Sequence, residues 1–335
     1  MYTQQLTLGK TSLTDPLDLD LVDVKGQPHA KRALEIAAAG GHSLLMIGPP
    51  GTGKTMLASR LPGIMPPLSN EEALEVAAVY SLKIRNTIPW GTRPFRAPHH
   101  TASAIALVGG GSNPQPGEIS LAHNGVLFLD ELSEFDKHVL EVLREPLESG
   151  SILISRAARQ AEFPARFQLV AAMNPCPCGY LGDAKGRCQC TIETIRRYAA
   201  RISGPLLDRL DMHIEVPSLP TETLLSKETV EEKSEEVRNR VIKASTIQYE
   251  RANKPNSRLV NREIQKTCSL NEQTKNLLYK AMEKLGLTAR SYHRVLRVAR
   301  TIADLDNSPD IQTEHISESL SFRKIDRERS AHTGF

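Results

Sequence analysis

A glycine-rich loop near the start of the chain constrains the fold more than any other stretch. Residues 48–55 fit the pattern G-x-x-x-x-G-K-T, with an apolar run at 44–47 before them and a helix-compatible segment at 56–61 after them. Strand, loop and helix in this order predict a nucleoside triphosphate site, because backbone N–H groups of such a loop can surround phosphates. Lys54 would reach the β and γ phosphates, and the Thr55 hydroxyl could bind Mg²⁺. The predicted phosphate-binding residues are Gly48, Pro49, Pro50, Gly51, Thr52, Gly53, Lys54 and Thr55.

Two further strands are predicted to end at the same phosphates. Residues 125–131 are a short apolar run that ends in Asp130 and Glu131, which is typical of a buried parallel strand. Asp130 would hold Mg²⁺ through water, and Glu131 would polarise the attacking water. Residues 167–174 form a second apolar run, and it ends in Asn174, whose amide could position that water. We therefore expect hydrolysis of the bound nucleotide as well as binding.

Composition allows two domains and excludes several classes of protein. The chain has 335 residues, of which 40% are hydrophobic and 24% charged, as in ordinary globular proteins. A net charge of +3 is too small for bulk attraction to nucleic acid, so any such surface must be local. We find no apolar run long enough to span a membrane and no secretory signal pattern, and we expect a cytoplasmic protein.

The pattern of apolar residues and breakers divides the chain into four parts. We expect a linker or arm at 1–20, a nucleotide-binding core at 21–220, a small all-helical domain at 221–323 and a tail at 324–335. Within the core, Ser69 begins a capping box for a helix over 73–82, and 139–147 reads as one helix. Within the helical part, residues 269–272, with Ser269 and Glu272 spaced as in a capping box, are expected to cap a helix that Gly286 closes.

Longer phrases resemble a known family over most of residues 20–322. Residues 93–101 (RPFRAPHHT), 117–125 (GEISLAHNG), 174–179 (NPCPCG) and 201–209 (RISGPLLDR) are similar to the magnesium-chelatase-like ComM/YifB group of AAA+ ATPases. The resemblance implies an α/β P-loop AAA+ core with a mostly parallel sheet flanked by helices, followed by a helical lid. Members of the group usually carry an additional amino-terminal domain resembling the Lon protease fold, which we expect this chain to lack.

The resemblance also assigns roles to three polar residues. Asn174 matches sensor 1, Arg209 matches the arginine finger that enters a neighbouring subunit's site, and Arg290 matches sensor 2, which the lid would bring onto the nucleotide. Other interpretations remain open: Arg209 could form an ion pair with Asp208 or Asp211. Arg290 could belong, with Arg294 and Arg297, to a stripe that solvates the outer face of its helix.

The resemblance implies a homo-oligomeric ring, a hexamer, that hydrolyses ATP with Mg²⁺. ComM-like proteins are DNA motors that promote branch migration while transforming single-stranded DNA is integrated, and we adopt that interpretation. The alternative is a motor that remodels a protein partner, as in magnesium chelatase. The catalytic residues do not separate the two.

Two insertions are expected to reach the pore of such a ring. Residues 102–118 look like a helix interrupted by a glycine-rich loop, and 151–164 alternate like a hairpin with Arg156 and Arg159 near its tip. Those arginines could bind DNA phosphates or could simply be solvated. Aromatic residues make up only 4% of the chain, which favours contact with the DNA backbone, without sequence recognition, over base stacking.

Four cysteines gather in a glycine-containing loop at 176–190. They form two C-x-C pairs, and four thiolates suit tetrahedral Zn²⁺, although C-x-C is a less usual spacing than C-x₂-C. A structural zinc and four reduced thiols both remain open. For the adjacent His99 and His100 we expect hydrogen bonding, not metal binding. The four cysteines are Cys176, Cys178, Cys188 and Cys190.

Overall fold

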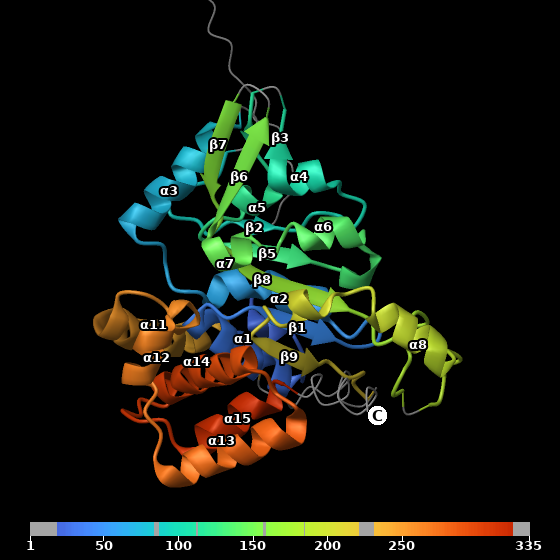
Figure 1. The fold of residues 1–335 in the computed structure, drawn as a ribbon, viewed down its shortest axis with the longest axis vertical. Helices are drawn as coiled ribbons and strands as arrows, with labels where there is room; N and C mark the ends of the chain where they lie inside the picture. The colour runs from blue at the N-terminus through green and yellow to red at the C-terminus, as the bar shows by residue number, and fades with distance from the viewer. Residues whose placement is uncertain are drawn as a thin grey trace, which may run out of the picture.

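A parallel sheet forms the centre of the protein in the computed structural model, which describes residues 19–83, 87–111, 113–156, 159–183, 185–220 and 231–323. Its five strands lie in the order β2-β5-β8-β1-β9, and every neighbouring pair is parallel. Helices flank the sheet, and further helices follow it in the chain (Figure 1). The expected α/β core with a carboxy-terminal helical part is confirmed. The strands are β1 (Leu44–Ile47), β2 (Phe95–Arg96), β5 (Val126–Leu129), β8 (Gln168–Met173) and β9 (Met212–Glu215).

The order of strands explains how distant segments meet. The central strands β5, β8 and β1 are short apolar runs that are almost completely buried, as expected for strands covered on both faces. Leu127 pairs with Leu169, and Val170 pairs with Leu44, so the three strands end at one edge. The segments that follow β1, β5 and β8 therefore lie side by side.

Helices on both sides of the sheet connect these strands. Two are well specified by sequence: α1 begins at Pro28, and α3 has the expected capping box between Ser69 and Glu72. In the core the helices are α1 (Pro28–Gly40), α2 (Lys54–Ile64), α3 (Asn70–Ser81), α4 (Ala104–Val108), α5 (Glu118–Leu121), α6 (Lys137–Glu141), α7 (Pro146–Ser149), α8 (Ile192–Ala199) and α9 (Gly204–Leu207).

Two local expectations were wrong. Residues 139–147 do not form one helix: α6 ends at Glu141, and α7 begins at Pro146, a residue that fits the first turn of a helix but not its interior. The side chain that caps the later helix α13 is Asn271, which accepts a hydrogen bond from the backbone N–H of Thr274, and not Ser269.

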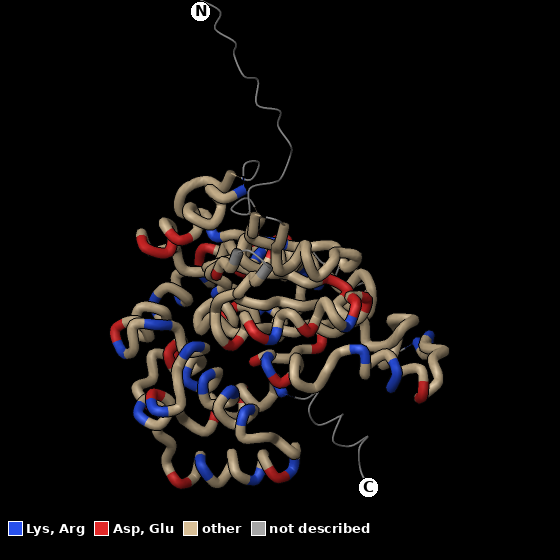
Figure 2. The backbone as a smooth tube through the Cα atoms, turned by 45° about the horizontal axis from the view of Figure 1, so that its top comes forward, with Lys and Arg blue, Asp and Glu red and all other residues tan. Residues whose placement is uncertain are grey.

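The carboxy-terminal helices pack partly on the core and partly on one another. Val241 of α11 and Ile302 of α14 join the apolar cluster that contains α1 and β1, whereas Leu278 and Ile316 join a separate cluster within the helical part. Charges of both signs are interspersed along the backbone, in keeping with the small net charge (Figure 2). These helices are α11 (Ser234–Ala252), α12 (Asn261–Thr267), α13 (Glu272–Leu285), α14 (Ala289–Leu305) and α15 (Thr313–Ser321).

The two insertions are present as expected. The first contains α4, a short ladder of β3 (Gly109–Gly110) with β4 (Gln115–Pro116), and α5. The second is the hairpin of β6 (Ser151–Arg156) and β7 (Arg159–Pro164). Nearly all of the expected arm at 1–20 and the whole tail at 324–335 lie outside the described residues. Among the helices of the described ranges, none is long and apolar enough to cross a membrane.

Candidate nucleotide-binding site

The glycine loop joins β1 to α2 at the carboxyl edge of the sheet. Gly53 has φ +87° and directly precedes Lys54, the first residue of α2, so the first N–H groups of this helix are directed at the loop. Gly48 is needed for a different reason: a Cβ atom there would lie 2.1 Å from the carbonyl oxygen of Val216. The loop is therefore held tightly against the end of β9, and the N–H groups at the start of α2 face it.

Lys54 lies at the centre of the loop. Its Nζ donates hydrogen bonds to the carbonyl oxygens of Gly48 (2.7 Å) and Pro49 (2.8 Å) and lies 3.4 Å from Oδ1 of Asn174. Burial lowers the pKa of Lys54, and the nearby Asp130 carboxylate partly offsets this effect. The ammonium group is thus placed between the loop and the end of β8, as an anion-binding group should be.

The two expected magnesium ligands are in contact. Oγ1 of Thr55 donates a 2.7 Å hydrogen bond to Oδ2 of Asp130, and the backbone N–H of Glu131 donates one of 2.9 Å to the other carboxylate oxygen. A hydroxyl and a carboxylate are ligands that Mg²⁺ prefers. The geometry fits a metal bound between the glycine loop and β5, with Glu131 exposed beside it.

His100 joins this site, and sequence reasoning gave it no role there. Its Nδ1 lies 3.0 Å from Oε2 of Glu131, and its ring stands edge-on to Phe135 with centroids 6.5 Å apart. His99 instead bonds Oγ1 of Thr101 at 2.9 Å. The adjacent histidines in the Pro-His-His phrase were the available signal, but nothing in that phrase indicates which partner each ring has.

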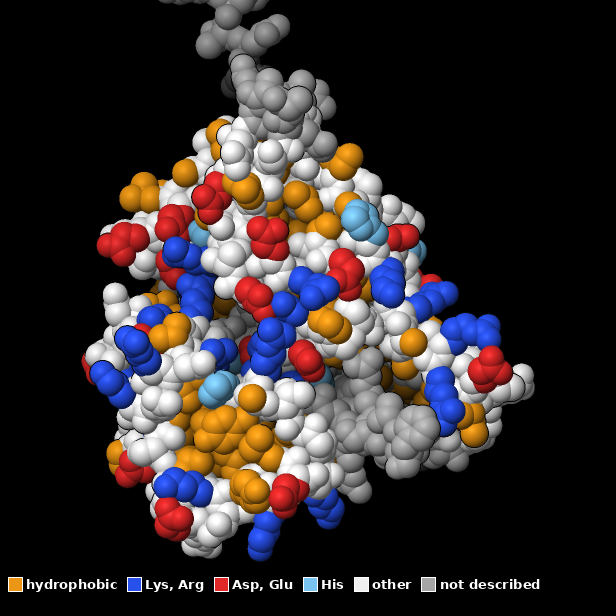
Figure 3. All heavy atoms as spheres, viewed as in Figure 1, with side chains coloured by type: hydrophobic (Ala, Val, Ile, Leu, Met, Phe, Trp, Pro, Cys, Tyr) orange, Lys and Arg blue, Asp and Glu red, His pale blue; other side chains and the backbone are white. Residues whose placement is uncertain are grey.

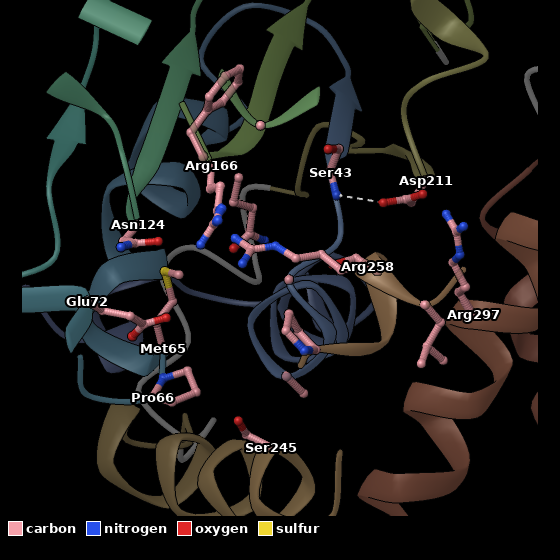
Figure 4. A pocket seen from close by; sticks show the side chains of 18 of the residues that line it. Ser43, Met65, Pro66, Glu72, Asn124, Arg166, Asp211, Ser245, Arg258 and Arg297 are labelled. Atoms are coloured by element: carbon pink, nitrogen blue, oxygen red, sulfur yellow. Dashed lines mark hydrogen bonds between the residues drawn. The ribbon is translucent and has the colours of Figure 1, made fainter. Parts of the chain in front are cut away.

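A large arginine-lined cavity lies at the opposite edge of the sheet. It has a volume of about 1270 Å³ and is bordered by Ser43, Asn124 and Asp211, which come just before β1, β5 and β9. Arg166, Arg258 and Arg297 line it as well (Figure 4), and Lys and Arg side chains gather where the core meets the carboxy-terminal helices (Figure 3). Its lining includes no residue of 48–55, and none of Asp130, Glu131 and Asn174.

The predicted arginine finger and sensor 2 meet at this cavity. Arg209 and Arg290 both line it. Arg290 was expected beside the glycine loop of its own chain, but the cavity that it borders contains no residue of that loop. Arg209 is buried and pairs with Oε1 of the exposed Glu148 at 2.6 Å, and not with Asp208 or Asp211. Its Nη1 donates to the carbonyl oxygen of Pro205 at 2.7 Å.

Within the arginine stripe of α14, Arg294 and Arg297 are half-buried against the core, whereas Arg290 is exposed at the cavity. Arg294 forms an ion pair with Asp211, and Arg290 and Arg297 line the same cavity. Nδ1 of His42 lies 3.5 Å from the Asp211 carboxylate, which also accepts a 3.1 Å hydrogen bond from the backbone N–H of Ser43. Asp211 thereby connects α14 to the start of β1.

The four loop cysteines come together. Their sulfur atoms all lie within 4.8 Å of one another, and the Sγ atom of Cys188 lies 3.8 Å from that of Cys176 and 3.7 Å from that of Cys178. The pKa of Cys178 is lowered to about 6, mainly by a hydrogen bond from the backbone N–H of Tyr180. Four sulfurs at this spacing could coordinate one tetrahedral ion.

Of the two arginines predicted to contact DNA, only the backbone is described. Arg156 and Arg159 pair across the described end of the β6–β7 hairpin, as expected. Their side chains, and residues 157 and 158 between them, lie outside the described structure.

Comparison with known proteins identifies relatives of the whole chain. The family described as magnesium chelatase, subunit ChlI, matches residues 20–224, and its C-terminal domain matches residues 231–323. The chain is 55% identical over 312 residues to Competence protein ComM of Haemophilus influenzae, covering 92% of this chain and 61% of that protein. It is 54% identical over 314 residues to the uncharacterized protein YifB of Escherichia coli, covering 93% of this chain and 62% of YifB.

A more distant relative is the magnesium-chelatase 38 kDa subunit of Cereibacter sphaeroides, 28% identical over 171 residues, or 45% of this chain and 51% of the subunit. The chain thus spans less than two thirds of the length of the ComM and YifB proteins it matches. Three observations decide the classification. The two family matches together cover nearly all described residues, the core is a parallel P-loop fold, and the identity to two relatives is above one half. The chain belongs to the magnesium-chelatase-like AAA+ family and, within it, to the ComM/YifB group.

Proposed function

We propose that this chain is the motor part of an ATP-hydrolysing ring that acts on DNA and promotes branch migration while transforming single-stranded DNA is integrated. The observation that carries the ATPase part is the meeting of Lys54, Thr55, Asp130, Glu131 and Asn174 at one edge of three adjacent strands. The DNA part rests on the 55% identity to a protein named for competence. The cytoplasm, where ATP and incoming DNA meet, is the proposed place of action.

Each residue of the site has a defined task in this proposal. The loop N–H groups and Lys54 bind the phosphates, and Thr55 and Asp130 would hold Mg²⁺, which supplies charge neutralisation when bound. Glu131 accepts the proton of the attacking water, and Asn174 orients that water toward the γ phosphate.

The position of the arginines supports ring formation. Arg209 and Arg290 line a cavity that does not contain the chain's own glycine loop, so neither is placed to act on its own nucleotide through that cavity. In a ring, this face would meet a neighbour's nucleotide, and both guanidinium groups would neutralise charge on its γ phosphate. A closed head-to-tail ring, a hexamer in our proposal, gives every subunit such a neighbour.

DNA would be held in the pore by the two insertions. The β6–β7 hairpin carries Arg156 and Arg159 next to its tip, and arginines there would bind phosphates without reading bases. A second candidate function is a motor that remodels a protein, in which the same hairpin would bind a polypeptide. The 28% identity to a magnesium-chelatase subunit is the observation that supports this candidate.

We also propose that Cys176, Cys178, Cys188 and Cys190 hold a structural Zn²⁺. A tetrahedral zinc with Zn–S bonds of about 2.3 Å places sulfurs about 3.8 Å apart. The Sγ atom of Cys188 lies 3.8 Å from that of Cys176 and 3.7 Å from that of Cys178, the Sγ atoms of Cys176 and Cys178 lie 3.3 Å apart, and all four sulfurs lie within 4.8 Å of one another, which supports this ligand set.

The test of the motor function is ATP turnover with and without single-stranded DNA at a low and a high salt concentration. Stimulation by DNA that fades with salt is the expected result, because phosphate contacts weaken steeply as salt rises. Turnover that is indifferent to DNA at low salt would reject the DNA motor and favour the protein-remodelling candidate.

A further inference from the structure

The cysteine loop packs directly on the glycine loop. Gly179 has φ +82°, and a Cβ atom on it would lie 2.7 Å from Cδ and 3.3 Å from Cγ of Pro50, inside the phosphate-binding loop. The same position is 3.9 Å from Cγ of Asn174. Gly179 therefore lies where the glycine loop and the end of β8 meet, and no larger residue fits there without a shift.

The cysteine loop also continues from sensor 1. Cys176 is fully buried and comes two residues after Asn174, and the backbone N–H of Gly179 donates a 2.9 Å hydrogen bond to the carbonyl oxygen of Cys176. This turn directly precedes Gly179, the residue that packs against Pro50. The position of Cys176 thus limits where the Asn174 amide can lie.

The far part of the loop is folded on itself by polar contacts. Both Nε and Nη2 of Arg187 lie 2.9 Å from carboxylate oxygens of Asp183, and the Arg187 guanidinium sits 4.1 Å from the centre of the Tyr180 ring. This arrangement places Cys188 next to the first cysteine pair. An ion bound by both pairs would join the far part of the loop to the segment behind Asn174.

We infer that a zinc ion held by the four cysteines positions the nucleotide site. The ion would fix Asn174 and Pro50 relative to Lys54. This inference rests on the proposed ATP and zinc sites and goes beyond them, since it makes nucleotide binding depend on the metal. Without the ion, the contact between Gly179 and Pro50 and the 3.4 Å contact between Asn174 and Lys54 lose their common support. ATP would then bind more weakly, although no cysteine touches it.

Metal content is measured first, on the purified chain and without any assay of activity. We expect one zinc per chain, and after exchange we expect Co²⁺ to give the thiolate-to-cobalt charge-transfer band and the d–d bands of a tetrahedral sulfur site. Cys188→Ser should lose these bands and should bind a fluorescent ATP analogue more weakly. Absence of zinc, together with no such cobalt bands in fully reduced protein, would overturn the inference.

Two glycine-to-alanine variants distinguish this coupling from a general loss of stability. Gly179→Ala should keep its zinc and bind the ATP analogue at least about five-fold more weakly, because the new methyl group collides with Pro50. Gly182→Ala is the matched control: Gly182 also has positive φ, +78°, but a Cβ there meets nothing within 4 Å. We expect that variant to keep both its zinc and its affinity.

The collision can also be relieved from the other side. Pro50→Ala removes the Cγ and Cδ atoms that the new methyl group would meet, so Gly179→Ala should cost much less affinity in a Pro50→Ala background. Equal losses in both backgrounds, or equal losses from Gly179→Ala and Gly182→Ala, would reject the coupling. Since metal content and binding need neither hydrolysis nor DNA, failure here differs from failure of the proposed motor function.

Discussion

Nδ1 of His100 lies 3.0 Å from Oε2 of Glu131, and this contact joins the segment after β2 to the acidic end of β5. Glu131 is the proposed acceptor of the proton from the attacking water, and a carboxylate engaged by an imidazole is less able to accept one. The His100 ring is itself in edge-on contact with Phe135. We interpret the pair as a restraint on hydrolysis when no DNA is bound.

Replacing His100 by alanine should therefore raise ATP turnover in the absence of DNA. We expect an increase of about two- to ten-fold, the range that corresponds to losing one modest hydrogen bond, and a smaller further stimulation by DNA. Thr101→Val is the control, since it removes the hydroxyl that His99 bonds but keeps both imidazole rings, whose centroids lie 4.1 Å apart, and it should leave basal turnover near that of the wild type. A fall in basal turnover of His100→Ala would show that the contact orients Glu131 productively.

Replacing Glu131 by glutamine should stop hydrolysis and leave ATP bound. The amide keeps the shape of the side chain but cannot take a proton, so turnover should fall by about 10²- to 10⁴-fold while affinity for an ATP analogue stays within a factor of about two. Turnover and equilibrium binding are measured on the same preparation. Undiminished turnover would remove Glu131 from its proposed role.

The sequence was sufficient to predict the parts of the site that lie on one continuous stretch each. The glycine loop, the acidic end of β5 and Asn174 at the end of β8 each follow a buried strand, and parallel strands bring such ends together. The hairpin of β6 and β7 was also predictable, because its alternation is local. The family resemblance added the expected roles of individual residues and the expectation that a helical lid follows the core.

The sequence was not sufficient where side chains from distant segments meet. The contact of His100 with Glu131, and the presence of both Arg209 and Arg290 at one cavity, depend on how whole helices dock and not on local pattern. The cysteines show the same limit: their spacing left zinc and free thiols equally open, and only the folded loop brings four sulfurs within 4.8 Å.

Mixed rings test whether Arg209 acts on a neighbour's nucleotide. Arg209→Ala and Lys54→Ala should each reduce turnover strongly, by about 10³-fold for the arginine finger. Mixing the two variants should recover part of the activity, because an Arg209→Ala subunit with an intact glycine loop can lie next to a Lys54→Ala subunit that offers its arginine. The same test applies to Arg290→Ala. If mixing restores nothing, although mixed rings form, both arginines act within their own subunit or only support the fold.

Asp211 should make the stability of the protein depend on pH in the acid range. Burial alone would raise the pKa of its carboxyl, but Arg294, His42 and Arg297 outweigh burial and hold that pKa well below its ordinary value. The unfolded chain, in which an aspartate has a pKa of about 3.9, therefore takes up this proton before the folded protein does. The stabilisation is fully present above that pKa and is lost as pH falls through it toward the folded pKa.

The free energy of unfolding of the wild type should accordingly fall more steeply from about pH 6 to about pH 3 than that of Asp211→Asn, which lacks the titrating group. Urea unfolding at several pH values gives both slopes, and the comparison uses slopes because the variant also leaves Arg294 without its partner at neutral pH. Parallel slopes for the wild type and Asp211→Asn would mean that the ion pair of Asp211 with Arg294 does not hold α14 to the core, and that the apolar contacts of α14 with α1 suffice.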